Sequence, residues 1–142
     1  IEEVEKIHRK MQVLLGNQRA YLDGIVFCPH HPDKGYPEEN PKYKIVCNCR
    51  KPATGMIEET ALRYNIDLAE SYMIGDSTAD ILAGRSAGVR TILVLTGQAG
   101  KDGKYDVKPD SIAEDLLDAV MQIIGNGDFH DERLQDTNKT IY

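Results

Sequence analysis

The chain has no surplus of basic residues and no long hydrophobic run, and these absences exclude whole classes of function. Its 142 residues carry 17 Lys and Arg against 23 Asp and Glu, a formal net charge of −6. Surfaces that bind nucleic acid need clustered Lys and Arg to meet the phosphates. Neither a signal peptide nor a membrane-spanning stretch is visible, and no basic amphipathic helix suggests a membrane surface. We therefore expect a cytoplasmic protein that binds neither nucleic acid nor membranes.

Cysteine is scarce as well, but all three cysteines fall in one stretch of the chain. Cys28 and His30 form a C-x-H pair, and after a loop of sixteen residues Cys47 and Cys49 form a C-x-C pair. Three thiolates and one imidazole are a full tetrahedral ligand set for structural Zn²⁺, with no position left open for catalysis. His31 is the competing imidazole, although the spacing favours His30. A disulfide with a spare thiol would fit a secreted protein, and scattered buried cysteines would not show this spacing.

The hydrophobic pattern alternates between helices and strands, which predicts an α/β domain with a parallel sheet. The expected helices cover residues 1–19, 54–62, 77–87 and 116–124, and the expected strands lie at 24–27, 71–74, 91–95 and within 107–112. Residues 29–46 are rich in Pro, Gly, Asn and charge, which predicts the metal-bound loop. From residue 125 to 142 the sequence is polar and without pattern, as in a linker or tail.

A second motif, G-D-S-T-A-D at residues 75–80, directly follows the expected strand at 71–74. Ligands of open α/β sheets bind at the carboxyl ends of the strands, so the carboxylate of Asp76 is expected to face that crevice. Asp80 lies one helical turn further on the same side. Two carboxylates there suit a hard cation such as Mg²⁺. Alternatively, both aspartates only cap the helix and favour its positive end.

Three motifs together resemble the zinc-loop phosphatases of the haloacid dehalogenase superfamily. They are C-P-H at 28–30, C-N-C-R-K-P at 47–52 and G-D-x-x-x-D at 75–80. The resemblance covers residues 1–124 and implies a Rossmann-like parallel sheet without a cap domain, followed by a tail at 125–142. The family acts on heptose bisphosphates and on histidinol phosphate. The length of the segment between the ligand pairs favours D-glycero-D-manno-heptose 1,7-bisphosphate as the substrate, with histidinol phosphate as the alternative.

The resemblance also implies a chemistry and roles for particular residues. It implies hydrolysis of a sugar phosphate through an aspartyl-phosphate intermediate, with catalytic Mg²⁺ and structural Zn²⁺ as cofactors. On this basis Lys51 neutralises the phosphoryl group and Asp76 binds Mg²⁺. Asp80 supports the metal site, and Arg50 contacts the substrate. The zinc would shape a loop that takes the place of a separate cap.

One feature of the family pattern is missing. Catalysis in the superfamily needs two aspartates in a D-x-D-G-T motif at the end of the first strand, and this sequence has no two aspartates at i, i+2. The resemblance makes residues 24–27, 71–74 and 91–95 the third, fourth and fifth strands, so the first two are lacking. We expect the chain alone to be inactive, with the missing strands supplied by an N-terminal segment or a second chain. A non-catalytic zinc-stabilised module that needs a partner chain is the other class of function.

Overall fold

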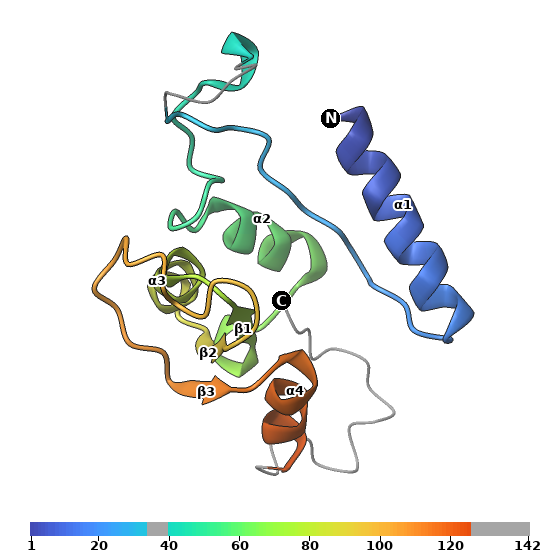
Figure 1. Ribbon diagram of the computed structural model, residues 1–142, viewed down its shortest axis with the longest axis vertical. Helices are drawn as coiled ribbons and strands as arrows, with labels where there is room; N and C mark the ends of the chain where they lie inside the picture. Colours follow the sequence, from blue (N-terminus) through green and yellow to red (C-terminus); the bar gives the residue numbers. More distant parts are fainter. Residues whose placement is uncertain (34–39, 126–142) are drawn as a thin grey trace. The chain divides into compact units, whose positions relative to one another are not determined.

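The computed structural model describes residues 1–33 and 40–125, and its contacts divide the chain into two units, Ile1–Val46 and Cys47–Tyr142 (Figure 1). Part of the expected metal-bound loop, residues 34–39, lies outside the described residues. The expected tail beyond residue 125 does so as well, and its separation from a domain at 1–124 therefore stays a prediction.

The first unit is built on one helix and an irregular chain. Helix α1 (Glu2–Asn17) confirms the helix expected at 1–19, and three acidic residues in its first turn favour the positive end of the helix dipole. None of its residues is buried. The 3-10 turn η1 (Pro41–Tyr43) lies near the end of this unit, where the Asn40 side chain accepts a hydrogen bond from the Lys42 N–H at 3.0 Å.

The strand expected at 24–27 is wrong, because the structure has irregular chain there. Val26 is 46% exposed and Phe27 37% exposed, so neither belongs to a sheet core. The Phe27 ring instead packs edge-on against His8 of α1, with ring centroids 5.3 Å apart. A run of apolar residues becomes a strand only where a neighbouring strand supplies backbone hydrogen bonds, and the described part of this unit contains no strand.

The second unit carries a parallel sheet, which confirms the predicted fold class. Its elements are α2 (Gly55–Tyr64), η2 (Leu68–Glu70), β1 (Tyr72–Gly75), α3 (Thr78–Ala87), β2 (Arg90–Val94), β3 (Ser111–Ala113) and α4 (Leu116–Gly125). The strands pair in the order β1-β2-β3, all parallel, with Ile74 opposite Ile92 and Val94 opposite Ala113. The strand expected within 107–112 forms only at its far end, as the short β3.

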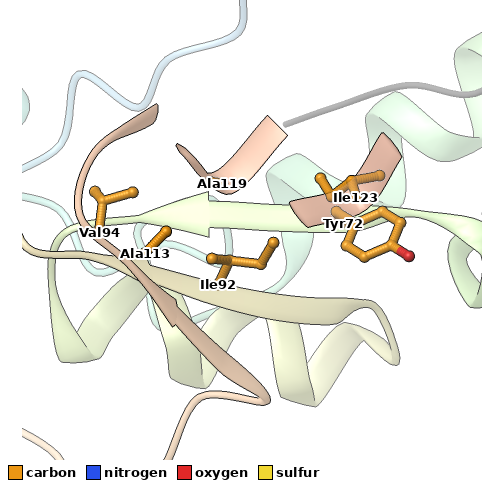
Figure 2. Close-up of a cluster of buried hydrophobic side chains, with 6 residues drawn as sticks. All are labelled: Tyr72, Ile92, Val94, Ala113, Ala119 and Ile123. Atoms are coloured by element: carbon orange, nitrogen blue, oxygen red, sulfur yellow. The ribbon is translucent and has the colours of Figure 1, made fainter. Parts of the chain in front are cut away.

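Helices cover both faces of this sheet, because alternate strand residues point to opposite sides. On one face, β-strand side chains pack against α4, and the cluster consists of Tyr72, Ile92, Val94, Ala113, Ala119 and Ile123 (Figure 2). On the other face, Met73 and Thr91 lie under Gly84 of α3, where an added Cβ would sit 2.8 Å from Met73 Cβ. The two layers of helix fix the strands, and therefore fix the edge of the sheet at which the strands end.

Candidate functional site at the carboxyl end of strand β1

Asp76 is the first residue after β1, and the loop that follows β2 holds it. Its Oδ2 atom accepts a hydrogen bond from the Gln98 N–H at 2.8 Å, and its backbone oxygen accepts one from the Gly100 N–H at 2.8 Å. Gly97 lies so close that an added Cβ would overlap Asp76 Oδ2, and its φ of 65° is in the left-handed region. Within the described residues Oδ1 accepts no hydrogen bond, which leaves this oxygen for a ligand.

Asp80 is buried, with 5% of its surface exposed, and protein groups engage both of its oxygens. Oδ1 forms an ion pair with Lys51 Nζ. Oδ2 accepts hydrogen bonds from the Ser77 N–H at 3.1 Å and the Ser77 hydroxyl at 2.6 Å, and Ser77 in turn caps the Asp80 N–H. Gly75 leaves room for this carboxylate, since a Cβ there would overlap Asp80. The metal-supporting role expected for Asp80 stays a prediction, while the capping alternative describes part of what it does.

The charge state of Asp80 follows from these contacts. Burial acts to raise the pKa of Asp80, but hydrogen bonds from Lys51 and Ser77 and the positive charge of Lys51 outweigh it, so that the pKa lies below its usual value. Asp80 is therefore an anion at neutral pH that fixes the Lys51 ammonium beside the tip of β1. A lysine has three N–H donors, and 38% of this side chain is exposed, so Nζ keeps donors for a further anion.

Lys51 reaches this position through a short turn between the second cysteine pair and α2. The Gly55 N–H donates to the Asn48 oxygen at 2.9 Å, and the Ala53 N–H donates to the Arg50 oxygen at 3.0 Å. These bonds close the turn on itself and direct Lys51 toward Asp80. Arg50 lies half-buried in the same turn.

The four residues expected to bind zinc come together. Cys28 Sγ lies 3.8 Å from His30 Nδ1, and Cys47 Sγ lies 3.2 Å from Cys49 Sγ. One donor atom from each of the four lies within 4.8 Å of every other, and none of the three cysteines is in a disulfide. Donors about 2.0–2.3 Å from a tetrahedral zinc would be spaced by roughly 3.5–3.8 Å. The donor types fit zinc, and the Cys28–His30 pair has this spacing, whereas the two sulfurs of Cys47 and Cys49 lie closer together. The cluster includes His30, the imidazole that the spacing favours, and leaves out His31.

Sequence reasoning missed a third carboxylate near Asp76. Asp102, in the loop after β2, accepts hydrogen bonds from the Thr78 N–H at 2.8 Å and from the Thr78 hydroxyl at 2.6 Å. The hydroxyl bond and then the N–H bond hold the pKa of Asp102 below its usual value. The sequence marks residues 97–104 only as a turn rich in Gly, Lys and Asp. No local pattern predicts which residue that turn contacts, since Thr78 and Asp102 are 24 positions apart.

A parallel sheet flanked by helices, with aspartates where β1 ends and a lysine paired to one of them, defines an α/β protein with charged side chains gathered at the carboxyl end of a strand. The model of the HAD-hydrolase-like family matches residues 48–119, about half of the chain, and the chain belongs to this family. The resemblance drawn from the motifs is thereby confirmed.

Individual relatives and a solved structure show which members of this family the chain resembles. The chain is 44% identical over 100 residues to the D-glycero-beta-D-manno-heptose-1,7-bisphosphate 7-phosphatase of Haemophilus ducreyi, covering 70% of this chain and 52% of that protein. It is 39% identical over 127 residues to the D-glycero-D-manno-heptose-1,7-bisphosphate 7-phosphatase of Thermosynechococcus vestitus, covering 84% and 63%. The crystal structure of the D,D-heptose 1,7-bisphosphate phosphatase of B. bronchiseptica, complexed with magnesium and phosphate, matches with a TM-score of 0.71 and 33% identity.

The matched relatives are longer than this chain. The match to the B. bronchiseptica structure includes 87% of this chain but only 64% of that protein. The matches to the two relatives above include 52% and 63% of their lengths. No helix in residues 1–33 or 40–125 has the length and apolar character needed to cross a membrane.

Proposed function

We propose that the chain belongs to a Mg²⁺-dependent phosphatase that hydrolyses a sugar phosphate, D-glycero-D-manno-heptose 1,7-bisphosphate. The observation that carries the proposal is the ion pair between Lys51 and buried Asp80, beside Asp76 at the carboxyl end of β1. Phosphoryl transfer depends mainly on positioning the group and on stabilising its negative oxygens. The names of the two relatives and the magnesium and phosphate in the B. bronchiseptica crystal structure support the same assignment.

The residues act in distinct ways in this proposal. Lys51, held by Asp80, donates its remaining N–H groups to the phosphoryl oxygens and neutralises their charge. Asp76 holds Mg²⁺ through the oxygen that Gln98 leaves open, and Arg50, in the same turn as Lys51, binds the rest of the substrate. Magnesium, when bound, supplies positive charge to phosphate oxygens. Asp80 acts mainly by holding Lys51, because both of its oxygens already have protein partners.

Structural Zn²⁺ has a separate part in this function. The cluster of Cys28, His30, Cys47 and Cys49 holds the chain that leads directly into the turn bearing Lys51. A closed four-ligand site offers no open position for chemistry, so the metal contributes folding free energy and shape. Reduced thiols in a metal cluster also support a cytoplasmic location, which fractionation of the source cells would test.

The nucleophile of this reaction has to come from outside the 142 residues, because the sequence contains no D-x-D pair. We therefore propose that a further segment of the protein or a second chain supplies it. The decisive experiment is phosphate release from heptose 1,7-bisphosphate and from histidinol phosphate, with and without Mg²⁺. It compares the 142-residue chain, a longer protein that includes an aspartate pair, and that longer protein with Lys51→Met, Asp76→Asn or the exposed-site control Asp106→Asn.

The expected result is Mg²⁺-dependent release by the longer protein, faster on the heptose substrate, and none by the 142-residue chain. Both site variants should lose at least about 100-fold in rate, as expected for groups that stabilise charge in the transition state, while Asp106→Asn stays active. Turnover by the chain alone would contradict the external nucleophile, and preference for histidinol phosphate would reassign the substrate.

The alternative, a non-catalytic zinc-stabilised module, is favoured by one observation, the complete Cys/His cluster in a chain without an aspartate pair. Chelation separates the two functions. It should unfold a zinc-dependent module outright, whereas the second unit of a phosphatase, which has its own sheet and core, should keep its circular dichroism.

A further inference from the structure

Asp102 is a charged residue to which the proposed reaction gives no part, yet both of its carboxylate oxygens are held firmly. Oδ1 accepts from the Thr78 N–H at 2.8 Å and Oδ2 from the Thr78 hydroxyl at 2.6 Å. Thr78 is the first residue of α3 and lies two positions after Asp76. The Tyr105 N–H also donates to the Thr78 hydroxyl, at 3.3 Å. The loop between β2 and β3 is thus fastened to the beginning of α3 (Figure 1).

The same loop makes the contacts that orient Asp76. Gln98 donates to Asp76 Oδ2 and Gly100 donates to the Asp76 backbone oxygen. Residues 97–105 therefore touch the stretch 76–78 at several points along the loop, and Asp102 provides its only carboxylate contact among the described residues. Contacts on both sides of residue 100 leave the loop little freedom to move away from Asp76.

The composition of the loop explains why it needs such a fastening. Gly97 and Gly100 adopt φ values of 65° and 71°, and a chain with several glycines has many alternative conformations to lose when it becomes ordered. At Gly97 the close approach to Asp76 leaves no space for a side chain, so the loop cannot be made stiffer at that point. Hydrogen bonds to an ionised carboxylate are about twice as strong as neutral ones, and Asp102 makes two of them.

We propose that Asp102 is a positioning residue for Asp76, which it orients by tying the loop 97–105 to Thr78. The proposal rests on the metal-binding role proposed above for Asp76. Held in this way, the Gln98 N–H occupies Oδ2 and leaves Oδ1 directed for the cation. Groups that orient a metal ligand in this manner typically change metal affinity about 10–100-fold when they are removed. A residue that only capped α3 would affect stability and leave Asp76 unchanged.

The test uses the 142-residue chain with Asp102→Asn and a matched control, Asp106→Asn. Both changes remove one negative charge from the segment between β2 and β3, but Asp106 is exposed and makes no hydrogen bond to Thr78. Asn at 102 keeps one oxygen to accept from the Thr78 N–H, so the helix cap and the fold are retained. A second variant, Thr78→Val, removes the hydroxyl from the other side and keeps the backbone bond. Circular dichroism checks that each variant is folded.

Two readouts are needed, both from nuclear magnetic resonance. The first is the hydrogen-exchange rate of the Gln98 and Gly100 amides. The second is the Mg²⁺ affinity, followed by the amide signals of Gly75 and Asp76 during a titration that extends to tens of millimolar, as a hard cation with few protein ligands requires. Asp102→Asn and Thr78→Val should speed exchange several-fold and weaken Mg²⁺ binding about 10-fold, whereas Asp106→Asn should change neither.

Unchanged exchange at Gln98 and Gly100 in folded Asp102→Asn would overturn the proposal, because the loop would then be held without it. Faster exchange with unchanged Mg²⁺ affinity would overturn it too, since Asp102 would have a structural role only. Equal changes in exchange and Mg²⁺ affinity in Asp106→Asn would also overturn the proposal, because the loss of one negative charge would then explain both changes. Failure of the proposed function is visible separately: Asp76→Asn would then bind Mg²⁺ as the unaltered chain does, whatever the exchange rates show.

Discussion

Removing Lys51 tests the central interaction of the site, and the structure sets the size of the expected effect. Taking away one partner of a fully buried ion pair costs about 3–5 kcal/mol, while an exposed pair is worth at most about 1 kcal/mol. The Asp80 side chain is 6% exposed and that of Lys51 is 38% exposed, so this pair falls between the two limits. Asp80 would keep its two hydrogen bonds from Ser77, which lessen the cost of its unpaired charge.

We therefore expect Lys51→Met, which keeps an aliphatic stem, to lower the free energy of unfolding by about 1–3 kcal/mol at pH 7. The chain has no tryptophan, so far-ultraviolet circular dichroism in urea is the suitable assay. With a slope of about 1–3 kcal/mol per molar urea, the midpoint should fall by roughly 1 M. Lys101→Met is the matched control, because Lys101 is exposed and at a loop position.

The pH dependence gives a second, independent test. The folded pKa of Asp80 is below its unfolded value of about 3.9, so the stabilisation is present above pH 4 and is lost as the pH falls through the folded pKa. Lys51 supplies part of this lowering, and the gap between the unaltered chain and Lys51→Met should therefore shrink in acid. A gap of equal size at pH 7 and pH 3, or a loss within about 0.5 kcal/mol as in a neutral surface change, would refute the reasoning.

Three further outcomes are expected. Metal analysis should find about one zinc per chain, lost in Cys49→Ser and retained in His31→Gln; zinc loss in His31→Gln would assign the wrong imidazole. Gly84→Ala gains about 1 kcal/mol of helix propensity but places a Cβ 2.7 Å from Thr91 Cγ2, and such crowding typically costs about 1–3 kcal/mol. The free energy of unfolding measured in urea should therefore fall, and a more stable variant would contradict this packing. The hydrogen bond from the Thr91 hydroxyl holds the pKa of Asp110 below its usual value. In thermal melts, Asp110→Asn should therefore lose less stability than the unaltered chain when the pH falls below about 4. An equal loss in both proteins would rule out this contribution.

The helix termini show how far local sequence signals reach. Ser77 and Asp80 form the capping box that begins α3, and Gly88, at φ 80°, ends it. Both were predictable, because a cap depends on residues a few positions apart. The strand at 24–27 failed for the opposite reason: the apolar residues are there, but strand pairing needs a partner from elsewhere in the chain.

The order of residues along the chain was enough to predict the cluster of Cys28, His30, Cys47 and Cys49 and the aspartates after β1, because each depends on short spacings and on the alternation of helix and strand. Only the tertiary structure decided which groups surround those aspartates. Asp76 meets Gln98 across 22 positions and Thr78 meets Asp102 across 24, and both contacts exist because parallel strands bring their carboxyl ends to one edge of the sheet. Such contacts have no sequence periodicity, so the fold alone brings them together.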